Sequence, residues 1–131
     1  MGEVVNQGKF GWNELLTTDL EAARAFYGSL LGWNYTEHRM ADGGTYVVAT
    51  MEGQPVGGMF AMTGDGFKGA PPHWMAYVTV ADVNGLAAKT TALGGTVLSP
   101  PTDIPTVGRF CVIKDPTGAA VALMQWAQPP A

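Results

Sequence analysis

Apolar and polar residues alternate, or form short apolar runs, in eight segments of the chain separated by Gly, Pro and Asp residues. Alternation with a period of two, together with aromatic and β-branched residues, predicts β-strands. The short turn Glu52-Gly53 joins two of these segments, which predicts an antiparallel hairpin. The segments expected to form strands are 10–17, 35–40, 45–51, 54–61, 73–81, 96–99, 109–114 and 119–125.

Two other segments repeat apolar residues at the three- and four-residue spacing of a helix. Thr18 and Glu21 match a capping box at the start of the first helix, and Gly32 ends it. Asp82 is the expected N-cap of the second helix, which ends at Gly94-Gly95. Residues of the first helix at helical spacing are Leu20, Ala23, Phe26, Tyr27, Leu30 and Leu31. Those expected to face inward in the second are Val83, Leu86, Ala87, Thr90 and Leu93.

The two helical segments belong to a repeated unit. Asp19 and Gly32 are separated by the same number of residues as Asp82 and Gly95, and a strand precedes each helix. A constant offset over several elements indicates two copies of one supersecondary unit. The predicted fold class is α+β: two tandem βαβββ units that form a curved, mostly antiparallel sheet, shaped as a cup with its helices outside. The predicted organisation is a single domain, 1–131, with units at 8–61 and 73–126 and a linker at 62–72.

Composition narrows the possible partners. The chain has 131 residues, 47% of them hydrophobic, which is enough to build a core. Its net charge of −4, with only seven Lys and Arg residues, disfavours nucleic acid and anionic membranes as partners. No secretory signal or membrane-spanning apolar run is visible, so we expect a cytoplasmic protein. Cys111 is the single cysteine, which rules out an intrachain disulfide.

Three segments resemble the vicinal-oxygen-chelate superfamily, which includes glyoxalase I, extradiol dioxygenases and bleomycin-resistance proteins. They are the helix from Thr18-Asp19 through Phe26-Tyr27 to Gly32-Trp33, the turn Lys114-Asp115-Pro116-Thr117-Gly118, and the start of the second copy at Val80-Ala81-Asp82-Val83. The resemblance covers nearly the whole chain. It implies the fold, and it leaves the reaction open because one fold hosts many activities. It also implies that a homodimer is possible.

The resemblance further implies where a metal site would lie. Family members take His, Gln or Glu ligands from strands of both copies. The corresponding positions here hold Trp12, Met75 and Ala122. Divalent metals need oxygen, imidazole or thiolate donors, so we expect no metal ligand and no cofactor.

Strand alternation predicts which side chains line the cup instead. If Trp12 faces it, so does Glu14, which would be its only evident charge. Such a carboxylate suits acid–base catalysis or the binding of a cation, although it could equally pair with an Arg or face solvent. Trp12 and Tyr77 could stack on a flat ligand or simply pack in a core. The candidate ligand-binding residues are Trp12, Glu14, Met75, Tyr77 and Met124, with Glu14 as the candidate catalytic residue.

Other polar residues favour structural roles. His38 lies between Glu37 and Arg39 and is expected to face solvent. His73 could reach the rim of the cup, but a structural role is favoured. Arg109 could contact an anion or pair with Glu14. Gly57-Gly58 lacks the pattern of a phosphate loop and indicates a strand irregularity.

Three functions remain open. The favoured one is a metal-free module that binds a small aromatic or cationic molecule. The second is a glyoxalase- or dioxygenase-type enzyme (a lyase, isomerase or oxygenase) that acts on a small carbonyl or aromatic compound, with Glu14 as a possible base. The third is a cup that is vestigial or contributes to a subunit interface.

Overall fold

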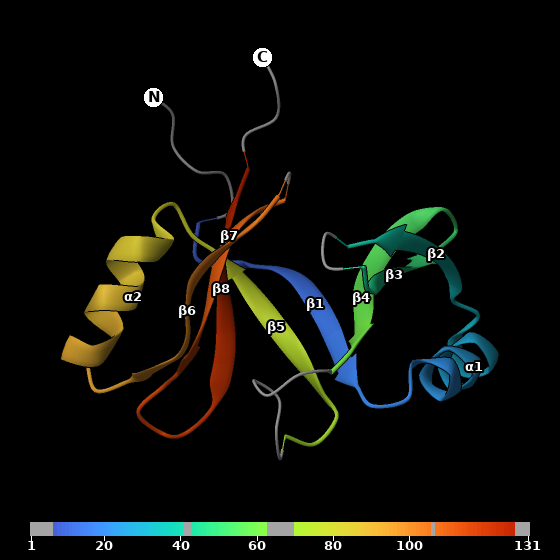
Figure 1. Ribbon diagram of the computed structural model, residues 1–131, viewed down its shortest axis with the longest axis horizontal. Coiled ribbons are helices and arrows are strands. Elements are labelled where there is room, and N and C mark those ends of the chain that lie inside the picture. Colours follow the sequence, from blue (N-terminus) through green and yellow to red (C-terminus); the bar gives the residue numbers. More distant parts are fainter. Residues whose placement is uncertain (1–6, 41–42, 63–69, 106, 128–131) are drawn as a thin grey trace. The chain divides into compact units, whose positions relative to one another are not determined.

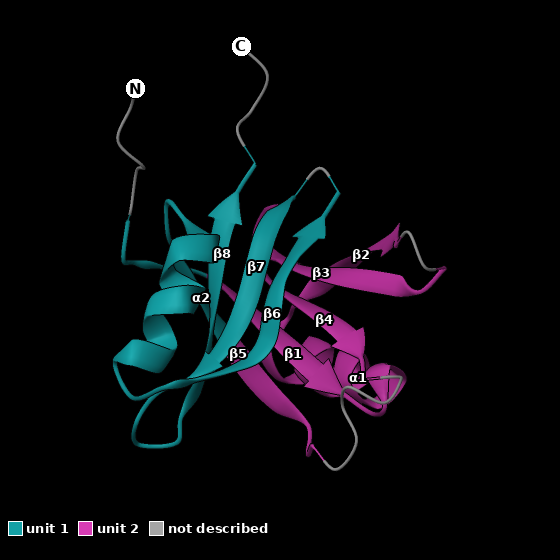
Figure 2. Cartoon of the chain, turned by 60° about the vertical axis from the view of Figure 1, so that its left-hand side comes forward, with its two compact units in different colours: residues 1–11, 76–131 teal, residues 12–75 magenta. Residues whose placement is uncertain are grey.

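The computed structural model describes residues 7–40, 43–62, 70–105 and 107–127. The chain divides into two compact units, shown in different colours in Figure 2. Unit 2 comprises residues 12–75, and unit 1 comprises residues 1–11 together with 76–131. Most of the predicted 62–72 linker lies outside the described residues.

Unit 2 contains a four-stranded sheet and one helix (Figure 1). The strand order is β2-β3-β4-β1, in which β4 and β1 run parallel and the other pairs are antiparallel. The elements are β1 (Phe10–Thr17), α1 (Leu20–Leu31), β2 (Asn34–Arg39), β3 (Thr45–Met51) and β4 (Gln54–Ala61).

Unit 1 repeats this pattern. Its strand order is β5-β8-β7-β6, again with one parallel pair, β5 with β8, and two antiparallel pairs. The predicted α+β class, the βαβββ repeat and the mostly antiparallel pairing are therefore confirmed. The elements are β5 (His73–Thr79), α2 (Val83–Ala92), β6 (Thr96–Ile104), β7 (Gly108–Lys114) and β8 (Ala120–Trp126).

Each sheet buries one face against its own helix. In unit 2 the buried cluster of Leu15, Val47 and Met59 packs against Leu20 and Ala23 at the start of α1 and against Tyr27, Trp33 and Tyr35. In unit 1 the cluster is Val80, Val83, Ala87, Cys111 and Leu123. Successive strand residues point to opposite faces, so the neighbours of these core residues lie on the faces turned away from the helices.

The two helices begin in the same way, although the predicted capping box is wrong. Asp19, not Thr18, is the N-cap of α1, and its carboxylate accepts a hydrogen bond from the Ala22 amide at 3.0 Å. Asp82 caps α2 as predicted and accepts from the Gly85 amide at 3.1 Å. Both caps satisfy an amide that has no partner within the helix.

Not every apolar helical position is buried. Phe26 is 57% exposed and Leu30 is 63% exposed, although both share the helical spacing of the core residues. The inward orientation predicted for Leu93 is wrong, because Leu93 is the C-cap of α2 and is 67% exposed. No helix in the described ranges is long and apolar enough to cross a membrane.

The strand predicted at 96–99 is longer than expected. Strand β6 continues through Pro100 and Pro101 to Ile104. Strand β6 lies at the edge of the sheet, where a missing amide donor leaves no partner unpaired. Its register with β7 shifts on both sides of Ser99, which accommodates the prolines.

Replacing Asp19 by Ala should lower the free energy of unfolding by about 1 kcal/mol, because the Ala22 amide loses its acceptor. Asp19→Asn, which keeps a side-chain oxygen at this position, should lose much less. Urea unfolding of the two variants checks this prediction. Equal losses for Ala and Asn would show that the cap hydrogen bond contributes little.

Candidate functional site on the open face of unit 2

Strand β1 places two of the predicted site residues on one face. Leu15 packs toward α1, so Trp12, Glu14 and Leu16 project from the opposite face of the strand. We call this the open face of unit 2 because α1 does not cover it. Glu14 is only 6% exposed and Leu16 only 5%. A glutamate this buried is uncommon unless it is paired, so its surroundings indicate what it does.

Tyr46, on β3, joins Trp12 to Glu14. The Trp12 indole Nε1 donates a hydrogen bond to the Tyr46 hydroxyl oxygen at 2.9 Å. The Tyr46 hydroxyl in turn donates to the Glu14 carboxylate. The three side chains form a short chain of hydrogen bonds that ends on the buried carboxyl group of Glu14.

Burial and the negative charge of Glu14 both raise the pKa of Tyr46, in that order of importance. The hydrogen bond to Glu14 raises this pKa further, while the hydrogen bond from Trp12 opposes the shift. Each cause follows the general rule that low polarity and a nearby negative charge disfavour a phenolate. Tyr46 therefore keeps its proton and acts as a donor to Glu14 over a wide pH range.

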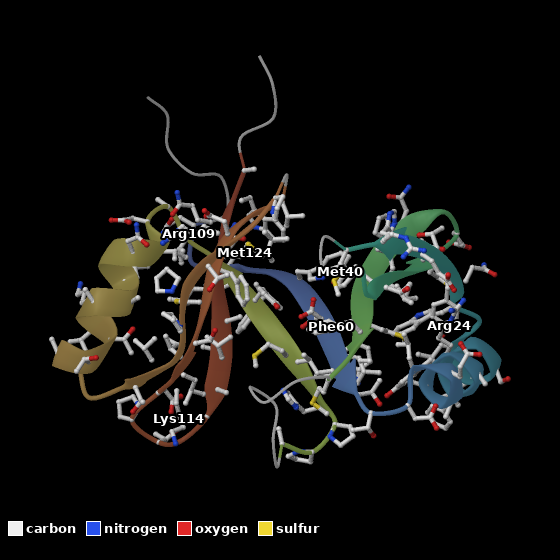
Figure 3. All side chains as sticks on the ribbon, viewed as in Figure 1. Arg24, Met40, Phe60, Arg109, Lys114 and Met124 are labelled. Atoms are coloured by element: carbon white, nitrogen blue, oxygen red, sulfur yellow. The ribbon has the colours of Figure 1, made fainter. Side chains whose placement is uncertain are left out.

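Strand β4 provides the rest of this face. Phe60, which Figure 3 labels on β4, lies with its ring centroid 6.1 Å from that of Tyr46. Gly58 pairs with Glu14 on one side and with Val48 on the other. Glu14 is thus held among aromatic and aliphatic groups, the environment typical of small-molecule sites with a few placed polar groups.

The remaining predicted ligand-binding residues lie on β5 and β8. Met75 is 7% exposed, and it lies at the start of β5, before the boundary at which the chain passes from unit 2 to unit 1. In unit 1, Tyr77 and Met124 lie on the face turned away from α2, because Leu123 beside Met124 packs in the helix-side cluster. Phe110 pairs with Met124, and its ring centroid is 6.3 Å from that of Tyr77. Met124 is labelled on β8 in Figure 3.

The other polar candidates have local partners. His38 is exposed as expected, and its Nε2 lies 3.4 Å from the Thr36 hydroxyl. His73 Nδ1 lies 2.8 Å from the Pro71 carbonyl oxygen. The Arg109 guanidinium donates to Asn84 and to Asp103, each at 2.9 Å.

The positions at which the family resemblance implies metal ligands do not fit a metal. The Trp12 indole nitrogen is a hydrogen-bond donor and is occupied with Tyr46. Met75 offers only a thioether and Ala122 only a methyl group. Within the described ranges, no three His, Cys, Asp or Glu side chains gather as a metal site would require.

Sequence reasoning missed Tyr46, Gly58 and Phe60. Tyr46 and Glu14 are far apart along the chain, and the contact depends on which strand lies between them. One signal was present, because a glycine inside a strand often marks a close approach by another group. Gly57-Gly58 was interpreted only as an irregularity, and the register does shift beside it, between Ala49 and Thr50.

Comparison with curated proteins identifies longer relatives. The chain is 42% identical over 120 residues to the proteins of Mycobacterium bovis and Mycobacterium tuberculosis that are named "Putative glyoxylase CFP32". The match covers 91% of this chain and 46% of each relative, so the chain spans about half the length of these relatives. It is also 28% identical over 127 residues to the anthracycline biosynthesis protein DauV of a Streptomyces species, with 88% of this chain and 46% of that protein covered.

Solved structures share the fold at low sequence identity. The methylmalonyl-CoA epimerase of Mycobacterium tuberculosis superposes with a TM-score of 0.65 and 15% identity, covering 97% of this chain and 94% of that one. A hypothetical protein from Bacillus halodurans gives a TM-score of 0.66 and 9% identity, covering 95% and 98%. A sequence model of one superfamily matches residues 9–123. The chain belongs to the Glyoxalase/Bleomycin resistance protein/Dioxygenase superfamily.

Proposed function

We propose that the chain binds a small molecule in which a cationic or N–H donor group is attached to a flat apolar part. The observation that carries this proposal is the buried carboxylate of Glu14 on the open face, beside Trp12, Tyr46 and Phe60. A buried negative charge is costly unless hydrogen bonds or a counter-charge compensate for it. A ligand cation supplies such a counter-charge, and aromatic rings favour flat or cationic groups.

The polar atoms of the open face favour ligands with hydrogen-bond donors over anionic ligands. The Trp12 indole N–H is used by Tyr46, and the Tyr46 proton is used by Glu14. An ionised carboxylate can only accept hydrogen bonds, so a ligand group that binds to it must be a donor. An anionic ligand would meet the negative charge of Glu14 at short range and low polarity, where repulsion is strongest.

A catalytic role for Glu14 is the second candidate. The carboxylate could remove a proton from a carbon next to a carbonyl group, giving an enolate that is later reprotonated at the same carbon. Two observations favour this alternative: Glu14 is hydrogen-bonded by Tyr46, and two relatives carry the name glyoxylase. General bases of this kind are held by neighbouring donors at a fixed distance from the substrate.

Benzylamine, benzyl alcohol and benzoate share one ring and differ in charge, so they test the binding proposal. Calorimetry should show saturable binding of benzylamine, weaker binding of benzyl alcohol and no binding of benzoate. In Glu14→Gln the Kd for benzylamine should rise about tenfold or more, equivalent to about 1.4 kcal/mol. Glu21, whose side chain is 90% exposed, provides the control in the same unit, and Glu21→Gln should leave this Kd unchanged. Equal binding of benzoate and benzylamine would contradict the proposal.

Proton exchange separates the catalytic alternative from simple binding. If Glu14 acts as a base, the protein should speed the loss of the CH₂ signal of hydroxyacetone in D₂O at least tenfold over buffer. Glu14→Gln should return the rate to that of buffer, because an amide does not accept the proton. Proton NMR follows the exchange. Binding of benzylamine without any proton exchange would support the binding function and contradict the catalytic one.

A further inference from the structure

We infer that Tyr46 is the positioning residue that fixes the Glu14 carboxylate on the open face. We also infer that Gly58 leaves the space through which the Tyr46 side chain reaches Glu14. This inference rests on the proposed role of Glu14 and adds the residues that orient it. Tyr46 does not need to touch the ligand, since it acts through Glu14. Its role follows from strand order, hydrogen-bond direction and the space above one glycine.

The strand order makes the Tyr46–Glu14 contact unusual. Tyr46 is on β3 and Glu14 is on β1, and β4 lies between these two strands. Neighbouring strands are about 4.8 Å apart, so the two backbones are separated by roughly 10 Å. The Tyr46 side chain must cross β4 to reach Glu14, whereas ordinary cross-strand pairs join adjacent strands.

Gly58 is the position on β4 over which Tyr46 crosses. A Cβ atom built on Gly58 would overlap the Tyr46 hydroxyl oxygen and would also approach Cζ of the same ring. The backbone of Gly58 does not have the positive φ that requires glycine. The glycine is therefore needed for space, and the space is filled by the hydroxyl group that holds Glu14.

The direction of the hydrogen bonds is fixed by chemistry. An indole N–H can only donate, so the Tyr46 oxygen accepts from Trp12. The single hydroxyl proton of Tyr46 is then directed at Glu14, which accepts it. A hydrogen bond to an ionised carboxylate is stronger and shorter than a neutral one. Trp12 fixes the hydroxyl and the hydroxyl fixes the carboxylate, while no buried polar side-chain atom of the described residues lacks a partner.

The first test needs no ligand. In Tyr46→Phe the Trp12 indole N–H loses its acceptor, so its exchange with D₂O should become at least tenfold faster and its NMR signal should move upfield. Comparison with Trp12→Phe identifies this signal among the four tryptophans. Tyr35→Phe is the matched control, because it removes a hydroxyl of the same unit that donates to the Arg24 carbonyl. An unchanged Trp12 signal in Tyr46→Phe would overturn the inference.

A double-mutant cycle tests whether Gly58 acts through the Tyr46 hydroxyl. Tyr46→Phe and Gly58→Ala should each raise the Kd for benzylamine about fivefold, and the double variant should be no weaker than either single variant. A role in packing alone would make the effects on Kd multiply, as for independent sites. Multiplying effects, or a Kd unchanged in Tyr46→Phe, would overturn the inference. If wild type does not bind benzylamine, the proposed function fails, and the Trp12 signal still decides the role of Tyr46.

Alkaline pH offers an independent prediction. The pKa of Tyr46 is raised above the value of 10.0 expected in the unfolded chain, so above pH 10 the folded state holds this proton more tightly. The contribution of Tyr46 to the free energy of unfolding is thus fully present below about pH 10 and decreases as the pH rises further. Between about pH 9 and pH 11, urea unfolding should show a smaller loss of stability in Tyr46→Phe than in wild type. Tyr35→Phe retains Tyr46 and should keep most of the wild-type loss, and identical pH profiles for wild type and Tyr46→Phe would contradict this assignment.

Discussion

One helix can cover only one face of a four-stranded sheet, and this constraint organises each unit. In unit 2, α1 covers the face that carries Leu15, Val47 and Met59. Side chains alternate along each strand, so this cover determines which residues lie on the open face. A shift of one residue in β1 would exchange Leu15 for Glu14 and bring a carboxylate into the helix-side core. The location of Glu14 is therefore a consequence of how the core forms.

The same constraint explains which features could be predicted from the sequence. The bounds of β1, β3 and β4 were predicted from their apolar, aromatic and β-branched residues, and the tight turn Glu52-Gly53 separates β3 from β4. The orientation of Glu14 away from the helix was predicted from alternation together with the family resemblance, which implies that Trp12 occupies a ligand position in the cup. The repeat was visible because Asp19 and Gly32 have the same spacing as Asp82 and Gly95. In the structure the two N-caps also have nearly the same φ, −140° at Asp19 and −143° at Asp82.

Features that depend on tertiary neighbours could not be predicted. The prolines of β6 are tolerated because β6 is an edge strand, and edge position is a property of strand order. Phe26 and Leu30 share the helical spacing of core residues, yet they remain exposed. Tyr46 is the clearest example. Its contact with Glu14 requires β4 to lie between β3 and β1 and requires a glycine at position 58. The local pattern of apolar and polar residues reveals neither the strand order nor the path of a side chain across a neighbouring strand.

Charge and hydrogen-bond direction together are the basis of the ligand preference that we propose for the open face of unit 2. A buried carboxylate among aromatic rings could serve as an acceptor, a base or a counter-ion, and these uses share one requirement, which is a fixed orientation. Trp12 and Tyr46 meet this requirement with one donor each, so neither donor is left to attract an anion. Gly58 contributes by having no side chain, which places the orienting hydroxyl within reach of Glu14. The proposed preference for donor ligands thus rests on the arrangement of four residues on three neighbouring strands.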